Sequence, residues 1–246
     1  MKTLILTSVF TFYAKDENGK RKAQRIDNKN GFLDNLQKEL KTRKCLVVIS
    51  GNPKMSHKKN PIIKVKEGFA LSDISFDEYI YVNDKNKQNI KEYIAKADCI
   101  DLCGGHLPTC NAFINELNLR ELIKDFNGVI IGASGGAMNM ADPVYCKPEA
   151  EGEGVDANFK RYLEGLGLTD IRIIPHYDFI KDKMLDGKKI VEEIILPDTY
   201  QTKLIALCDG SYIIQKENKK LLYGEAYLME NGLIKQICKK DQIVEL

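Results

Sequence analysis

A serine set among small residues is the clearest candidate for chemistry in this sequence. An apolar run, residues 129–131, leads into Gly132-Ala133-Ser134-Gly135-Gly136, and residues 137–140 continue in a helix-like manner. This G-x-S-x-G pattern is typical of a nucleophile elbow, a sharp strand-to-helix turn that lifts the hydroxyl above a sheet. Small neighbours let substrate come close, and the helix start offers N–H groups to an oxyanion. The same pattern also fits a tight turn without chemistry, so its meaning depends on its context.

A serine nucleophile needs a base, and the sequence holds three histidines. His176 ends the apolar run 171–175, where an α/β enzyme presents functional side chains. His106 follows Gly104-Gly105, so it could line the same pocket or only cap a helix. His57 lies in a charged loop. We therefore expect His176 to be the base.

The carboxylate that would orient this histidine is less well determined. Asp178 would share a strand face with His176, and Glu149 lies in a loop that returns from the expected elbow helix. Residue types and spacing leave several candidates open. They are Asp142, Glu149, Glu151, Glu153 and Asp178.

An oxyanion hole needs backbone N–H groups beside the nucleophile. Gly135 directly follows Ser134, and Gly104-Gly105 follows the preceding expected strand. Strands that neighbour in sequence are commonly neighbours in a sheet, and the crevice of a parallel sheet lies at the carboxyl ends of its strands. Both glycine-rich loops are therefore expected to face one pocket.

Apolar runs and helical periodicity alternate through most of the chain, which predicts a three-layer α/β/α fold. We expect a mostly parallel sheet of the flavodoxin-like type, covered on both faces. The C-terminal part, residues 204–246, is expected to add antiparallel hairpins to a single domain, 1–246. Strands are expected at 4–12, 45–50, 76–82, 97–103, 129–133 and 171–175, helices at 32–40, 62–69, 90–97, 108–122 and 190–196, and a loop at 13–30.

Composition excludes several other classes of function. The 37 basic and 35 acidic residues nearly balance, so charge gives no reason to expect nucleic acid or a membrane surface as a partner. The seven cysteines form no C-x-x-C pair, which predicts free thiols in a reducing, cytoplasmic setting, with no metal and no cofactor. Residues 4–12 suit a first strand better than a signal peptide, and no apolar run has the length of a membrane span.

Three segments together resemble the peptidase E (α-aspartyl dipeptidase) and cyanophycinase family of serine peptidases, whose fold is related to class I glutamine amidotransferases. They are Leu102-Cys103-Gly104-Gly105-His106, Ile131-Gly132-Ala133-Ser134-Gly135-Gly136-Ala137 and Ile174-Pro175-His176-Tyr177.

The resemblance implies a role for each matching residue. Ser134 would be the nucleophile and His176 the base, with Gly105 and Gly135 forming the oxyanion hole. The family's acid follows its serine by about fifteen residues, which points to Glu149 rather than Asp178. His106 replaces the family's asparagine after the glycine pair and is expected to contact substrate.

The sequence departs from the aspartyl dipeptidases after the histidine. Those enzymes carry basic residues there that bind the substrate's aspartate, and only Lys181 or Lys183 could correspond. We expect a serine peptidase or dipeptidase, monomeric or homodimeric, that cleaves small peptides, with N-terminal-aspartyl peptides as one candidate class. Two alternatives remain: an amide-handling domain like a glutamine amidotransferase, which would normally carry cysteine at the elbow, and a non-catalytic homologue.

Overall fold

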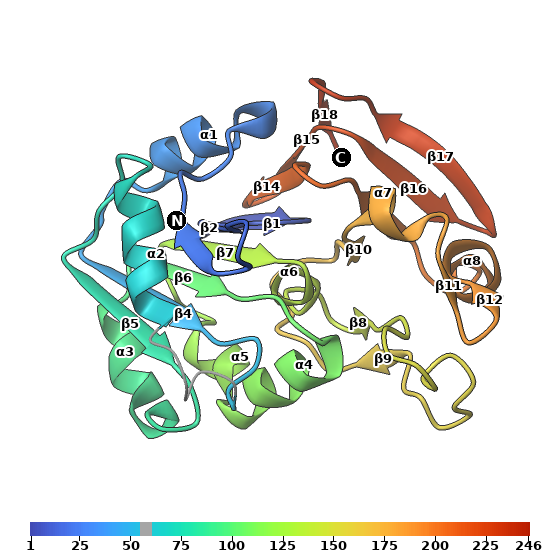
Figure 1. Ribbon diagram of the computed structural model, residues 1–246, viewed down its shortest axis with the longest axis horizontal. Helices are drawn as coiled ribbons and strands as arrows, with labels where there is room; N and C mark the ends of the chain where they lie inside the picture. The colour runs from blue at the N-terminus through green and yellow to red at the C-terminus, as the bar shows by residue number, and fades with distance from the viewer. Residues whose placement is uncertain (55–60) are drawn as a thin grey trace.

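A large, mostly parallel sheet forms the centre of the molecule (Figure 1). The computed structural model describes residues 1–54 and 61–246. The strand order of this eight-stranded sheet is β18-β15-β14-β1-β7-β6-β4-β5, and β1, β7, β6, β4 and β5 are parallel. Four of these strands are buried along their whole length, because both sheet faces are covered. The parallel strands are β1 (Thr3–Thr7), β4 (Cys45–Ile49), β5 (Glu78–Val82), β6 (Cys99–Leu102) and β7 (Val129–Ala133).

Helices pack on both faces of this sheet, which confirms the three-layer prediction. Ile90, Phe113 and Leu119 join one apolar core with one face of the strands, and Leu36 and Phe69 join a second core on the other face. No helix in the described part of the chain is both long and apolar enough to cross a membrane. The first core is covered by α3 (Ile90–Lys96), α4 (Leu107–Glu116) and α5 (Leu119–Leu122), and the second by α1 (Phe32–Glu39) and α2 (Pro61–Ala70).

The expected antiparallel strands at the C-terminal end are present, but they divide between two sheets. One set extends the central sheet beyond β1, and the other forms a smaller sheet of order β10-β13-β16-β17, at the right of Figure 1. The first set is β14 (Tyr212–Lys216), β15 (Lys219–Tyr223) and β18 (Ile243–Glu245). The smaller sheet contains β10 (Ile173–Ile174), β13 (Leu204–Leu207), β16 (Ala226–Glu230) and β17 (Leu233–Cys238).

Several local predictions need correction. The expectation of a loop throughout residues 13–30 is wrong, because β2 (Tyr13–Lys15) and β3 (Arg21–Ala23) form a hairpin there. The helix expected at 190–196 is a π-helical segment, η4 (Ile190–Ile195), followed by α8 (Leu196–Asp198). The short elements that remain are η1 (Lys29–Gly31), η3 (Lys87–Asn89), α6 (Gly135–Met138), β8 (Val144–Tyr145), β9 (Tyr162–Leu163), α7 (Tyr177–Ile180), β11 (Met184–Leu185) and β12 (Lys188–Lys189).

One charged side chain interrupts the apolar interior of the sheet. Asp101 lies in β6, level with Val48 of β4 and Ile131 of β7, and is 1% exposed. Its Oδ1 atom has no hydrogen-bond partner among the described residues. Burial raises the pKa of the Asp101 carboxyl from 3.8 to about 7. An unpaired carboxylate in the core is expensive, so this position opposes folding whenever it is ionised.

The first prediction concerns the free-energy cost of an ionised Asp101 in the core. Between about pH 4 and pH 7 the folded chain keeps a proton on Asp101 that the unfolded chain releases, so rising pH reduces the free energy of unfolding. The variant Asp101→Asn carries no such proton. Its stability relative to the parent chain should therefore grow across this range by up to about 4 kcal/mol and then level off. Denaturant unfolding at a series of pH values measures this difference.

The matched control is Asp77→Asn, which removes an exposed carboxylate. Its stability difference should change little with pH. A difference for Asp101→Asn that is equally flat would contradict the unpaired burial of this group.

Candidate active site

Ser134 occupies a strained turn between β7 and α6. Its backbone has φ 49° and ψ −119°, a conformation that non-glycine residues rarely adopt. The turn is held from both sides, because the Ser134 N–H donates to the carbonyl of Thr7 and the Ser134 carbonyl accepts from the N–H of Met138. A Cβ at Gly136 would lie 1.9 Å from the carbonyl oxygen of Leu102, so only glycine lets α6 start this close to β6. This is the backbone geometry that the nucleophile-elbow pattern predicts.

His176 lies directly after β10, in the neighbouring sheet, and its ring reaches Ser134. Its Nε2 atom is 3.1 Å from Ser134 Oγ, within hydrogen-bond distance. The residue itself has a left-handed backbone (φ 59°, ψ 36°), and its N–H donates to Ser8 Oγ at 2.7 Å. Ser8 follows β1 and is fully buried, so this contact ties the histidine to the central sheet.

The second ring nitrogen of His176 contacts Asp209. Nδ1 lies 2.7 Å from Asp209 Oδ1, and the Ser8 hydroxyl donates to the same oxygen at 2.7 Å. Burial alone would raise the pKa of Asp209. The hydrogen bonds from His176 and Ser8 and the positive charges of His176 and Lys29 outweigh it, so the pKa lies below its ordinary value. The carboxylate is therefore ionised at neutral pH and suited to hold an imidazolium.

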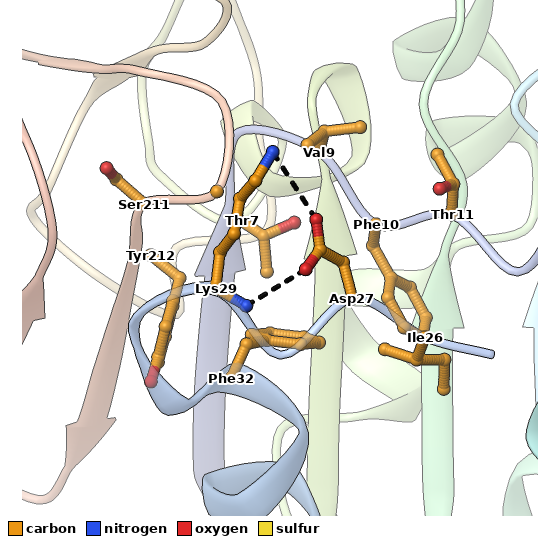
Figure 2. Close-up of a pocket in the computed structure, with 11 residues that line it drawn as sticks. Thr7, Val9, Phe10, Thr11, Ile26, Asp27, Lys29, Phe32, Ser211 and Tyr212 are labelled. Atoms are coloured by element: carbon orange, nitrogen blue, oxygen red, sulfur yellow. Dashed lines mark hydrogen bonds and ion pairs between the residues drawn. The ribbon is translucent and has the colours of Figure 1, made fainter. Parts of the chain in front are cut away.

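The positive charge of Lys29 is one of the causes that lower the pKa of Asp209. Its side chain packs against Gly210, and its Nζ is 3.4 Å from Asp27 Oδ2 (Figure 2). The cavity drawn in Figure 2 beside these residues is about 60 Å³, room for about two water molecules. It is too small to hold a peptide.

Glu149, which was expected to orient His176, lies elsewhere. Its carboxylate forms an ion pair of 2.9 Å with the buried Lys147, while both ring nitrogens of His176 already have partners. A neutral imidazole has one donor and one acceptor, so no place remains for a second carboxylate. Asp178 contacts Asp209 instead: its Oδ1 accepts a hydrogen bond from the backbone N–H of Asp209 at 3.1 Å.

Sequence reasoning therefore missed Asp209 and Ser8. The signal for Asp209 was present: it follows an apolar strand just as Ser134 and His176 do. Asp-Gly is also a common sequence of hairpin turns, so Asp209 was not among the candidates for the acid. No sequence pattern marks Ser8. It contacts His176 and Asp209, which lie 168 and 201 positions further along the chain.

The glycines predicted to form an oxyanion hole lie together beside Ser134. A Cβ at Gly135 would be 3.6 Å from the backbone nitrogen of Gly105, and one at Gly104 would be 3.0 Å from the Cβ of Ser134. Because β6 and β7 are adjacent, the loops after these strands meet at one edge of the sheet, as expected. The backbone of Gly105 therefore lies beside Gly135, the residue that follows Ser134.

The other predicted residues have different surroundings. The His106 ring lies 3.0 Å from Thr109 Oγ1 and 2.8 Å from Glu153 Oε1, and it is not among the residues that line the cavity at Ser134. Its contact with substrate stays a prediction. The Lys183 ammonium lies 3.1 Å from the centre of the Phe179 ring. His57 lies outside the described residues, and Asp142 pairs with Arg120 at 2.7 Å.

A cavity of about 310 Å³ opens at Ser134 and His176. Its described lining contains one carboxylate, Asp101, and neither lysine nor arginine. No group of three His, Cys, Asp or Glu side chains that could hold a metal ion occurs in residues 1–54 and 61–246. The cavity is lined by Ser8, Val9, Phe10, Phe12, Tyr13, Asp101, Cys103, Gly104, Gly105, Ala133, Ser134 and His176.

Comparisons with known proteins identify the fold and the family. A crystal structure of a protein from Listeria monocytogenes EGD-e, provisionally named peptidase E, superposes with a TM-score of 0.56 at 16% sequence identity. The match covers 96% of this chain and 99% of that one. No curated protein matches the sequence. The model of peptidase family S51 matches residues 23–222, most of the chain, so this protein belongs to peptidase family S51 and is a serine-type peptidase.

Proposed function

We propose that Ser134, His176 and Asp209 form a catalytic triad that hydrolyses small peptides. The observation that supports this most directly is the position of the His176 ring, with Nε2 3.1 Å from Ser134 Oγ and Nδ1 2.7 Å from Asp209. This is the order of contacts that lets a histidine act as a general base toward a serine.

The reaction would begin with proton transfer from Ser134 Oγ to His176 Nε2 as Oγ attacks the peptide carbonyl carbon. Asp209 accepts a hydrogen bond from Nδ1–H and stabilises the imidazolium that forms. His176 then protonates the leaving amine, and the acyl group stays on Ser134. A water molecule, deprotonated by His176, hydrolyses the ester and regenerates the serine.

Negative charge on the carbonyl oxygen would be held by the backbone N–H groups of Gly105 and Gly135. Such preorganised donors are worth about 10²–10³ in rate each in comparable sites. Gly135 directly follows Ser134, and Gly105 lines the same cavity as Ser134, which supports the assignment.

The contact between Ser134 and His176 also weighs on the alternatives. A degenerate, non-catalytic site would not need these atoms within hydrogen-bond distance or the strained backbone at Ser134. A glutamine amidotransferase-like reaction would normally use a cysteine at this turn, and here it is a serine. Peptide hydrolysis fits better than either.

The size and charge of the cavity bear on the substrate. About 310 Å³ is at the small end of ligand pockets, which suits a short peptide. An N-terminal aspartate would find no lysine or arginine in the described lining and would approach Asp101 instead. Aspartyl peptides are therefore not the substrates that this lining favours.

Labelling with a fluorophosphonate tests the nucleophile. We expect the parent chain to be labelled and Ser134→Ala to remain unlabelled, because only an activated serine reacts with this probe. The control Ser75→Ala removes an exposed hydroxyl and should label like the parent. Equal labelling of parent and Ser134→Ala would refute the role of Ser134.

Three carboxyl-to-amide variants test the acid. We expect Asp209→Asn to reduce kcat by about 10³–10⁴, because an amide can hold His176 in the wrong tautomer and cannot stabilise its charged form. Glu149→Gln should reduce kcat far less, since Glu149 contacts Lys147 rather than His176. Asp178→Asn should fall between them, because Asp178 holds the backbone of Asp209.

The measurement is the steady-state rate on one peptide substrate for all three variants, with thermal unfolding recorded alongside. A larger loss of kcat in Glu149→Gln than in Asp209→Asn would return the acid to Glu149.

A further inference from the structure

The unpaired carboxylate in the central sheet reaches the cavity of the proposed active site. Asp101 lies on the sheet face that α1 and α2 cover, and it lines the cavity together with Cys103 of the same strand end. Ser134 follows the neighbouring strand β7, three residues beyond Ile131, which is level with Asp101. At about 3.3 Å per residue, the nucleophile lies about 10 Å further along the sheet.

The cavity that Asp101 and Ser134 both line also has apolar and aromatic lining residues. Ala133 and Cys103 line the sheet side, and Phe10, Phe12 and Tyr13 line the cavity as well. The rings of Phe10 and Phe12 contact each other edge to face, with centroids 5.7 Å apart. A cavity whose lining contains aromatic rings and a carboxylate that is 1% exposed suits a long alkyl chain that ends in a cation.

No described residue supplies such a cation to the carboxylate of Asp101. Its Oδ1 accepts no hydrogen bond among the described residues, and no lysine or arginine lines the described part of the cavity. Buried carboxylates in proteins are normally paired, and an isolated one destabilises the fold. Asp209 shows the contrast, because it is held by Ser8, His176 and Lys29. A ligand that brings a positive charge would complete the site at Asp101.

We propose that Asp101 determines specificity by binding the cationic end of a lysine or arginine side chain on the acyl side of the scissile bond. This inference rests on the proposed peptidase function of Ser134.

The estimated separation of Ser134 and Asp101 along the sheet selects the source of the cation. The α-nitrogen of the acyl residue lies about 2.5 Å from the carbonyl carbon that Ser134 attacks, which is too near to reach Asp101. The ammonium of an extended lysine lies about 6 Å from its own Cα, and an arginine guanidinium slightly further. A side-chain cation therefore spans the distance, whereas an α-ammonium does not.

A set of fluorogenic amides tests the proposal. The substrates are the Nα-acetyl coumarin amides of lysine, arginine, norleucine and alanine, together with the amides of lysine and alanine that have a free α-amino group. We expect kcat/KM for Nα-acetyl-lysine to exceed that for norleucine, which has the same four side-chain carbons without the ammonium, by about 10- to 100-fold. Acetylation of the α-amino group should leave this preference in place.

The variant Asp101→Asn should abolish the ratio of lysine to norleucine, whereas the surface control Asp77→Asn should keep it. Each ratio comes from one protein preparation, so a partly unfolded variant lowers both rates and leaves the ratio unchanged. A purely structural role of Asp101 would therefore not change this measurement.

A second measurement does not depend on the variant. Nα-acetyl-lysine amide should protect Ser134 of the parent chain from a fluorophosphonate at lower concentration than Nα-acetyl-norleucine amide does.

The outcomes separate this inference from the proposed function. If the parent chain is neither labelled nor active on any amide, the peptidase role of Ser134 fails and the inference fails with it. If it is labelled and active but does not prefer the basic side chains, the inference alone is overturned. It is likewise overturned if activity requires a free α-amino group without regard to the side chain, because the cation would then be the α-ammonium.

Discussion

The hydrogen bond between His176 and Asp209 is the contact on which the site depends. It joins the ends of β10 and β13, two parallel neighbours in the smaller sheet, while Ser134 comes from β7 of the central sheet. Ser8, at the end of β1, contacts both His176 and Asp209 and so fixes the smaller sheet against the larger one. Ser134 and His176 are therefore aligned by the packing of two sheets, not by one loop.

Two of the non-glycine residues with positive φ lie where these sheets meet. Ser134 and His176 both have positive φ, and each is followed by a short helix that its backbone helps to begin. Such conformations cost about 1–3 kcal/mol each and persist only where the surroundings enforce them. Thr7 supplies the restraint at Ser134 through its carbonyl, and Ser8 supplies it at His176 through its hydroxyl. Consecutive residues at the end of β1 thus hold both strained turns.

The sequence predicted the parts of this arrangement that depend on local pattern. The buried parallel strands, the turn at Ser134 and the neighbouring glycine loop follow from apolar runs that end in small residues, and the structure agrees. The partner of His176 depends on the pairing of β10 with β13, whose strands are separated by about thirty residues of chain. The resemblance to the peptidase E family, whose acid follows its serine by about fifteen residues, pointed to Glu149, which the fold places against Lys147. Long-range strand pairing cannot be derived from a single sequence, and Asp209 depended on it.

The two carboxylates at this cavity differ in a way that separates their tasks. Asp209 is surrounded by donors and positive charge, so its pKa is lowered and its charge is already balanced by the protein. Burial raises the pKa of Asp101 to about 7, and nothing described in the chain balances its charge. A balanced carboxylate can steady a histidine through a reaction cycle, whereas an unbalanced one gains most from a charge that arrives from outside. The buried charge of Asp101 lowers the free energy of unfolding, and a bound cation would remove this cost. A buried carboxylate that opposes folding can in this way favour a substrate that carries a positive charge.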